Sequence, residues 1–126
     1  MTITATPMLT VRGAIQAVEF YTRAFGAEEV ERFTTPTIVV AELSIDGATV
    51  FVVDEAPEAH NLSPETLGGT SVRISLIVDD PDAFAKRAID AGATELFPVA
   101  DQPYGMRQGR VVDPFGHHWL IGKPLS

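Results

Sequence analysis

Hydrophobic positions recur in the same order in the two halves of this chain of 126 residues. In the first half, Val11 ends an apolar run, and apolar residues then follow at helical spacing as far as Phe25. In the second half, Val78 ends an apolar run 67 positions after Val11, and the same helical spacing follows. Gly26 and Gly92 end the two helical patterns, because glycine readily takes the left-handed conformation after a last turn. Each half therefore predicts a strand, a short turn and a helix.

The rest of the first half predicts three more strands. Alternating apolar and polar residues indicate strands, and turn residues separate one strand from the next. Asp46-Gly47 is a strong signal for a hairpin turn. The predicted elements are a strand from Pro7 to Val11, a helix from Ala14 to Phe25, and strands from Glu29 to Thr34, Thr37 to Ile45 and Ala48 to Asp54.

The second half predicts the same order of elements. Its helix is capped by Asp79 or Asp80 and has Pro81 in the first turn, where the missing N–H costs nothing. The predicted strands run from Val72 to Val78, Glu95 to Val99, Met106 to Asp113 and His117 to Gly122.

These patterns predict an α+β fold of two βαβββ modules that form a curved mixed sheet around a cavity. Residues 1–126 form a single domain, with the first module at about 5–55 and the second at about 71–124. The connection, at about 56–70, is rich in proline, glycine and polar residues and is a candidate lid. Two similar halves imply a cavity that they share.

Composition narrows the classes of partner. The chain is 45% hydrophobic and 21% charged, which suits a soluble globular protein. Its formal net charge of −8 argues against nucleic acid and anionic membrane surfaces as partners. The absence of cysteine excludes disulfides and thiolate metal sites. With no apolar run long enough to span a bilayer and no basic N-terminal leader, we expect a cytoplasmic protein.

Two motifs carry a resemblance to a known family. Residues 17–21 with 24–27, and the Asp-Pro-Phe-Gly-His stretch within residues 111–117, resemble the vicinal oxygen chelate superfamily of glyoxalases, bleomycin-resistance proteins and dioxygenases. Residues 63–70 and 101–105 resemble its PhnB-like branch. The resemblance covers almost the entire chain, and it implies the cavity-forming fold described above.

The same resemblance implies four positions for the ligands of a divalent metal ion. Members that bind a metal use His or Gln from each module's first strand and Glu from each module's last strand. Counting from Val11, Val78 and the two turns places these positions at Thr6, Phe51, Arg73 and Leu120. None is a usual ligand of a divalent cation, and arginine carries a permanent positive charge. We therefore expect no metal and no other cofactor.

Histidine and glutamate are the candidates for acid–base chemistry. His117 and His118 are neighbours at the start of a strand, so they point to opposite faces and cannot easily share an ion. The unperturbed pKa of histidine lies near 6.5, which makes His117 a weak candidate for a catalytic base. Glu42 is a second weak candidate, because alternation can turn it toward the cavity.

Candidate ligand-binding residues come from strands and turns that are expected to line the cavity. Arginine matches carboxylate or phosphonate, while aromatic and soft side chains form an apolar wall. For each arginine, an ion pair with a nearby carboxylate remains an open alternative, as does a core position for Trp119. The candidates are Phe51, Arg73, Ser75, Tyr104, Met106, Arg107 and Trp119, with Arg110 near them.

Three classes of function remain open. The favoured hypothesis is a metal-free protein that binds a small amphipathic or aromatic molecule in the cavity, with no reaction required. The second is a lyase, isomerase or dioxygenase that uses a metal or acid–base chemistry. The third is a regulatory or structural subunit with a filled interior. A homodimer is expected because edge strands of open sheets need cover, and the cavity then forms within one chain or between two.

Overall fold

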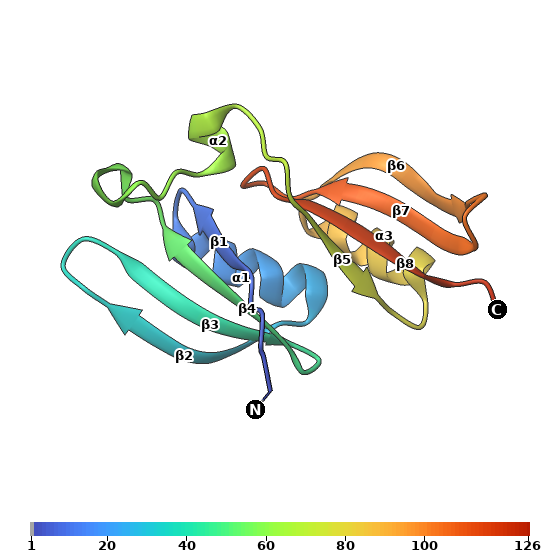
Figure 1. Cartoon of the computed structure of the whole chain (residues 1–126), viewed down its shortest axis with the longest axis horizontal. Helices are drawn as coiled ribbons and strands as arrows, with labels where there is room; N and C mark the ends of the chain where they lie inside the picture. Colours follow the sequence, from blue (N-terminus) through green and yellow to red (C-terminus); the bar gives the residue numbers. More distant parts are fainter. Residues whose placement is uncertain (1) are drawn as a thin grey trace.

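The computed structural model describes residues 2–126. Met1, which opens the predicted N-terminal stretch and domain, lies outside the described residues. The first module has the predicted βαβββ order (Figure 1). Its elements are β1 (Met8–Val11), α1 (Ala14–Phe25), β2 (Glu28–Thr34), β3 (Val39–Ile45) and β4 (Ala48–Asp54).

The second module repeats this order, so the prediction of an α+β fold with two βαβββ modules is confirmed. The connection, predicted as irregular, holds a single 3₁₀ turn, η1 (Pro57–Ala59), and the one-turn helix α2 (Pro64–Leu67). The remaining elements are β5 (Arg73–Ile77), α3 (Pro81–Ala91), β6 (Thr94–Asp101), β7 (Met106–Val112) and β8 (His118–Pro124).

Each module contributes its own four-stranded mixed sheet (Figure 1). The strand order is β1-β4-β3-β2 in the first, called sheet 1, and β5-β8-β7-β6 in the second, called sheet 2. The pairs β1–β4 and β5–β8 are parallel, and the other pairs are antiparallel. Helix α1 packs on one face of sheet 1 and α3 on one face of sheet 2, and we call the opposite face of each sheet its outer face.

Helices α1 and α3 bury their apolar stripes and join the two modules. Along β3, Ala41, Leu43 and Ile45 are buried beneath α1, whereas the alternate residues are not. Helices α1 and α3 also pack against each other, and the rings of Phe25 and Phe84 stack with centroids 5.5 Å apart. The hydrophobic core thus runs through the helices and leaves the outer faces of the sheets uncovered.

A buried carboxylate ties the modules together. Asp113, which is 4% exposed, accepts hydrogen bonds from the Tyr21 hydroxyl of α1 and, at 2.8 Å, from the indole N–H of Trp119. Its other oxygen accepts from the backbone N–H groups of Phe115 and His117. Burial is the main reason that the pKa of Tyr21 lies well above its ordinary value, and the negative charge of Asp113 adds to it. The Asp-Pro-Phe-Gly-His stretch is therefore a structural junction.

A second carboxylate holds the connection in place. Glu55 accepts a hydrogen bond of 2.7 Å from the backbone N–H of Ser63, and the Ser63 hydroxyl caps α2 by accepting from the N–H of Thr66. The Thr66 hydroxyl, followed by the Ser63 N–H, lowers the pKa of Glu55 from 4.5 to about 2. The ionised carboxylate of Glu55 thus anchors the connection through Ser63 and Thr66.

We expect acid to release the connection. Because the folded-state pKa of Glu55 is lowered, its stabilising effect is present above pH 4.5 and is lost as the pH falls toward about 2. The protection factors of the Ser63 and Thr66 amides, which correct the exchange rates for the intrinsic effect of pH, should fall over this interval, and a Glu55→Gln variant should show low protection at every pH. The matched variant Glu65→Gln should keep the pH dependence. Exchange rates that are the same in wild type and Glu55→Gln at pH 6 would contradict this role.

Among residues 2–126, no helix is both long enough and apolar enough to cross a membrane. The longest helix, α1, has 12 residues.

Candidate functional site

The four positions that the resemblance assigns to a metal lie on or next to the outer faces. Phe51 belongs to β4 and Leu120 to β8, each with its side chain on the outer face. Arg73 is the first residue of β5, and Thr6 lies just before β1. A hydroxyl, a guanidinium and two hydrocarbon side chains do not fit a divalent cation. In the described part of the chain, no group of three or more His, Asp or Glu residues is placed to hold a metal ion.

The outer face of sheet 1 carries a hollow of about 200 Å³. Phe33, Val40 and Phe51 form its apolar wall, and Glu31 and Glu42 supply carboxylates. Glu31 and Glu42 are cross-strand neighbours in the β2–β3 ladder, so the two acids stand side by side. Phe51 pairs with Glu42 on β3 and with Met8 on β1. Two sequence-predicted residues, Phe51 and Glu42, therefore share one site.

The outer face of sheet 2 carries a second hollow, of about 250 Å³, with different chemistry. No carboxylate lines it; its lining residues are Phe97, Gln102, Tyr104, Gln108, Gly109, Arg110 and Leu120. The Tyr104 hydroxyl donates a hydrogen bond of 2.7 Å to Oε1 of Gln108. The Gln102 amide donates to the main-chain oxygen of Gln108 at 3.0 Å. These bonds hold the turn between β6 and β7 against the hollow.

Arg110 is the charged group of this second hollow. Its guanidinium carbon lies 5.5 Å from the centre of the Phe97 ring, within the range of a cation–π interaction. Its Nε atom is buried without a hydrogen-bond partner in residues 2–126. In that same range, Arg110 forms no ion pair with a carboxylate.

His117 lies away from both hollows, at the junction of the modules. It lines an apolar cleft of about 320 Å³ between β1, α2 and β5. Its Nε2 atom is 2.8 Å from the backbone oxygen of Thr10, so one ring nitrogen is already engaged across the junction. His118 pairs instead with Arg73 in the β5–β8 ladder. The structure therefore gives His117 a bridging contact between the two modules.

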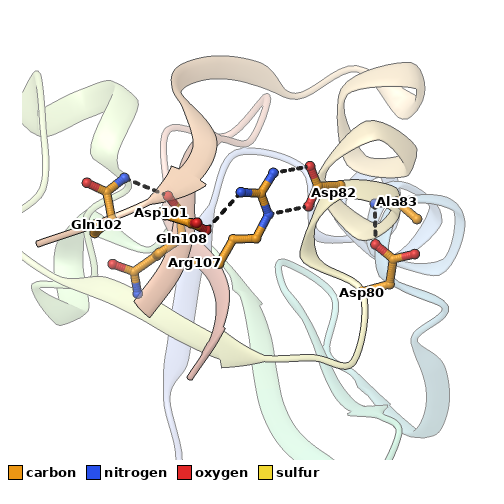
Figure 2. A network of polar contacts seen from close by, with 7 residues as sticks. All are labelled: Asp80, Asp82, Ala83, Asp101, Gln102, Arg107 and Gln108. Carbon is orange, nitrogen blue, oxygen red and sulfur yellow. Dashed lines mark hydrogen bonds and ion pairs between the residues drawn. The ribbon is translucent and has the colours of Figure 1, made fainter. Parts of the chain in front are cut away.

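Two other predicted binding residues lie on the helix side of sheet 2. Trp119 is fully buried in the core, where its ring packs on Tyr21 and Phe25. Arg107 is held by Asp82 of α3 at 2.7 Å and by Asp101 at 3.0 Å (Figure 2). These carboxylates raise the pKa of Arg107 further above its ordinary value. For these reasons neither residue is part of the binding site that we propose below.

The remaining predicted residues are spread over the molecule. Tyr104 is 63% exposed above the second hollow, as its turn position suggests. Ser75 lies on β5 and lines a groove between the modules together with Phe25 and Phe84. Met106 opens β7 opposite Pro124. The structure thus brings Tyr104 and Arg110 together but leaves Ser75 and Met106 outside that hollow.

Three side chains of the second hollow were not singled out from the sequence. Gln108 shares the face of Arg110 by simple alternation along β7, so that signal was available. Gln102 is bound to β7 from the turn and could not be inferred from alternation. Phe97 lies on β6 between two shifts of register, which hide its orientation from the sequence.

The sequence and the fold of this chain are similar to those of known proteins. The family model described as Glyoxalase/Bleomycin resistance protein/Dioxygenase superfamily matches residues 4–121. An uncharacterized protein of Mycobacterium bovis is 44% identical over 124 residues, covering 94% of this chain and 82% of its own length. The crystal structure of an Arabidopsis thaliana gene product has a TM-score of 0.75 at 29% identity and covers 98% of this chain and 100% of that one. TioX from Micromonospora has a TM-score of 0.77 at 28% identity with the same coverage.

Proposed function

The chain belongs to the Glyoxalase/Bleomycin resistance protein/Dioxygenase superfamily, and from this membership we propose that it binds a small amphipathic or aromatic molecule without the help of a metal ion. The ligand lies on the outer faces of the sheets, where aromatic walls stand beside a few polar groups. Such a mixture is typical of small-molecule sites.

The observation that carries this proposal is the pair of hollows on the outer faces. Each combines a phenylalanine wall with charged or amide groups. Their volumes of about 200 and 250 Å³ are each smaller than the usual ligand cavity of about 300–1,000 Å³. One hollow brought against the other reaches the usual size, so we propose that the complete cavity uses both faces.

The absence of a metal in the proposal rests on the chemistry of the four family positions. Thr6 and Arg73 replace the expected imidazole or amide donors, and Phe51 and Leu120 replace the expected carboxylates. A structural or catalytic zinc site needs three or four converging donors. The Arg73 guanidinium adds electrostatic repulsion against any cation at this place.

We further propose that the chain forms a homodimer in which the outer face of sheet 1 of one copy covers the outer face of sheet 2 of another. Large apolar side chains stand uncovered on both faces: Phe33 is 68% exposed and Phe97 is 55% exposed. A twofold arrangement would bury both pairs of faces at once and form two equivalent cavities. Exposed apolar patches of this kind are typical of interaction surfaces.

Within the superfamily, we propose that the chain belongs to the PhnB-like branch. The supporting segments are residues 63–70 and 101–105. The first contains the capped helix α2 and lines the cleft at the module junction. The second contains the turn that carries Tyr104 over the hollow of sheet 2.

Native mass spectrometry of tag-free protein, purified without added metal, tests these proposals together. We expect the mass of two chains with no divalent ion, and additional mass from co-purified small molecules that collisional activation releases. A control spectrum after addition of equimolar zinc or manganese should show no tightly held ion.

One firmly retained divalent ion per chain would contradict the metal-free site. A mass of one chain at micromolar concentration would contradict the dimer and a cavity that needs two copies. A dimer that takes up none of a set of added aromatic and amphipathic compounds would contradict small-molecule binding.

A further inference from the structure

Arg110 differs from most other arginines of the protein in having no partner. Arg12, Arg32 and Arg107 pair with carboxylates, and Arg23 and Arg87 donate hydrogen bonds to backbone oxygens. Of the seven arginines, all within the described residues, only Arg73 and Arg110 have neither kind of contact. Acidic residues outnumber basic ones by 17 to 9, so a free arginine is unexpected by charge balance alone.

The surroundings of Arg110 make its lack of a partner energetically important. Arg73 is exposed at the start of its strand, whereas Arg110 is half-buried and its Nε atom is shielded from water. A buried N–H of a charged group without an acceptor costs free energy, and a ligand that supplies an acceptor recovers it. The cation–π contact with Phe97 holds the guanidinium in position meanwhile.

A second donor stands in the same hollow. Because the Tyr104 hydroxyl occupies Oε1 of Gln108, the amide nitrogen of Gln108 is left as a donor. Leu120 and Phe97 form the apolar part of the lining, and no carboxylate competes for the guanidinium. The hollow therefore offers N–H donors, a positive charge and an aromatic wall, but no anionic group of its own.

We infer that the hollow on sheet 2 is an anion-binding subsite in which Arg110 holds the carboxylate of a planar aromatic acid, whose ring packs against Phe97. This inference rests on the proposed small-molecule function and names the class of its ligand. A guanidinium matches a carboxylate with two parallel hydrogen bonds, and the ring of the acid lies on the apolar part of the lining. Tyr104 is a positioning residue, since it orients the Gln108 amide.

Binding of 1-naphthoate and 1-naphthamide, measured by isothermal titration calorimetry, tests the inference. The two probes share one ring system and differ in charge. We expect the wild type to bind naphthoate about tenfold or more tightly than naphthamide, the range of a charged hydrogen bond. Arg110→Gln should remove this preference and leave the affinity for naphthamide within about twofold of wild type. Arg110→Lys keeps the positive charge but loses the paired N–H donors of the guanidinium, so it should retain only part of the preference.

The control Arg32→Gln removes the same charge from β2, where Arg32 pairs with Glu29, and should leave both affinities unchanged. Thermal unfolding of each variant shows whether it is folded. Equal affinity of the wild type for both probes would overturn the anion subsite and leave the proposed function standing. Binding of neither probe would overturn both.

A last variant tests the rival partner for Arg110. In the proposed dimer, the rival partner is Glu42 of a second copy, whose carboxylate would neutralise the guanidinium. If so, Glu42→Gln should strengthen naphthoate binding about tenfold, and that result would overturn the inference because the arginine would already have a partner. An affinity within about twofold of wild type supports it.

Discussion

Replacement of Asp113 by alanine is expected to lower the free energy of unfolding by about 3–5 kcal/mol, the largest effect of any single polar substitution that we predict. The carboxylate is buried and accepts four hydrogen bonds, two from side chains and two from the backbone. Alanine leaves the Tyr21 hydroxyl and the Trp119 indole N–H buried without an acceptor. Chemical denaturation followed by the fluorescence of Trp119 measures the loss.

Two milder variants separate the parts of this network. Asp113→Asn keeps an acceptor for the backbone N–H groups of Phe115 and His117 but points an amide at Trp119, so it should fall between wild type and Asp113→Ala. Tyr21→Phe removes one donor and should cost about 1 kcal/mol. An Asp113→Ala protein within about 1 kcal/mol of wild type would show that water replaces the carboxylate and that the junction is not buried in solution.

Alkaline pH gives a further readout of the same network. The pKa of Tyr21 is raised above 10.0 in the folded protein, so its stabilising effect is complete below pH 10 and is lost as the pH rises toward the folded-state value. Wild-type stability should therefore decline at alkaline pH. The decline should be smaller in Tyr21→Phe, which has no hydroxyl to ionise.

Substitution of Gly109 by alanine is the second change with a large expected effect. A Cβ atom at this position would lie 2.7 Å from the backbone N of Val99 and 2.8 Å from the backbone O of Phe97. Neither atom is on a flexible side chain, so β6 must move away from β7. We expect a loss of about 1–3 kcal/mol, the usual cost of overpacking, in denaturant unfolding. Phe97 would also shift from Arg110, so naphthoate affinity should fall.

The direction of this effect is diagnostic. Glycine to alanine in an open strand position favours folding by about 0.4–1 kcal/mol, because it restricts the unfolded chain. The control Gly47→Asn lies in the hairpin turn, where an added Cβ meets nothing within 4 Å and asparagine tolerates a positive φ. The positive φ of 94° strains any side chain, but no atom has to move, so Gly47→Asn should cost less than Gly109→Ala. A Gly109→Ala protein as stable as Gly47→Asn would refute the close approach of β6 to position 109.

The elements of module 1 were predictable because their local signals agree with their packing. Helix α1 has the bounds expected from its apolar spacing and from Gly26, which takes the left-handed conformation at φ 68°. Strand β4 also has the expected bounds, since Asp46-Gly47 fixes the hairpin before it. In both cases one face is buried against the core, so the pattern in the sequence reports the fold directly.

Strand β6 shows where such inference ends. Alternation predicts Glu95 to Val99, whereas the strand extends over Thr94–Asp101. Its pairing with β7 shifts register on either side of Phe97, and most of its residues are exposed. A bulge changes which face a side chain occupies without leaving a clear mark in the pattern. The aromatic wall of the sheet 2 hollow was therefore beyond reach of the sequence.

Arg107 and Arg110 illustrate a different limit. The two residues lie three positions apart on β7, so alternation places them on opposite faces. It does not say which face the helix covers. In the fold, Arg107 meets Asp82 of α3, 25 residues earlier in the chain, and Arg110 meets the aromatic ring of Phe97. Only the placement of α3 over sheet 2 separates a structural ion pair from a candidate binding group.

The single carboxylate at the junction also bears on how the two halves have diverged. The residue 67 positions before Asp113 is Asp46, which lies exposed in a tight turn, and the residue 67 positions after Tyr21 is the buried Ala88. Each half thus contributes a part that the other has no copy of: a hydroxyl from the first and its acceptor from the second. The halves are complementary and no longer interchangeable, so a tandem of two first halves or of two second halves would lack one member of the pair.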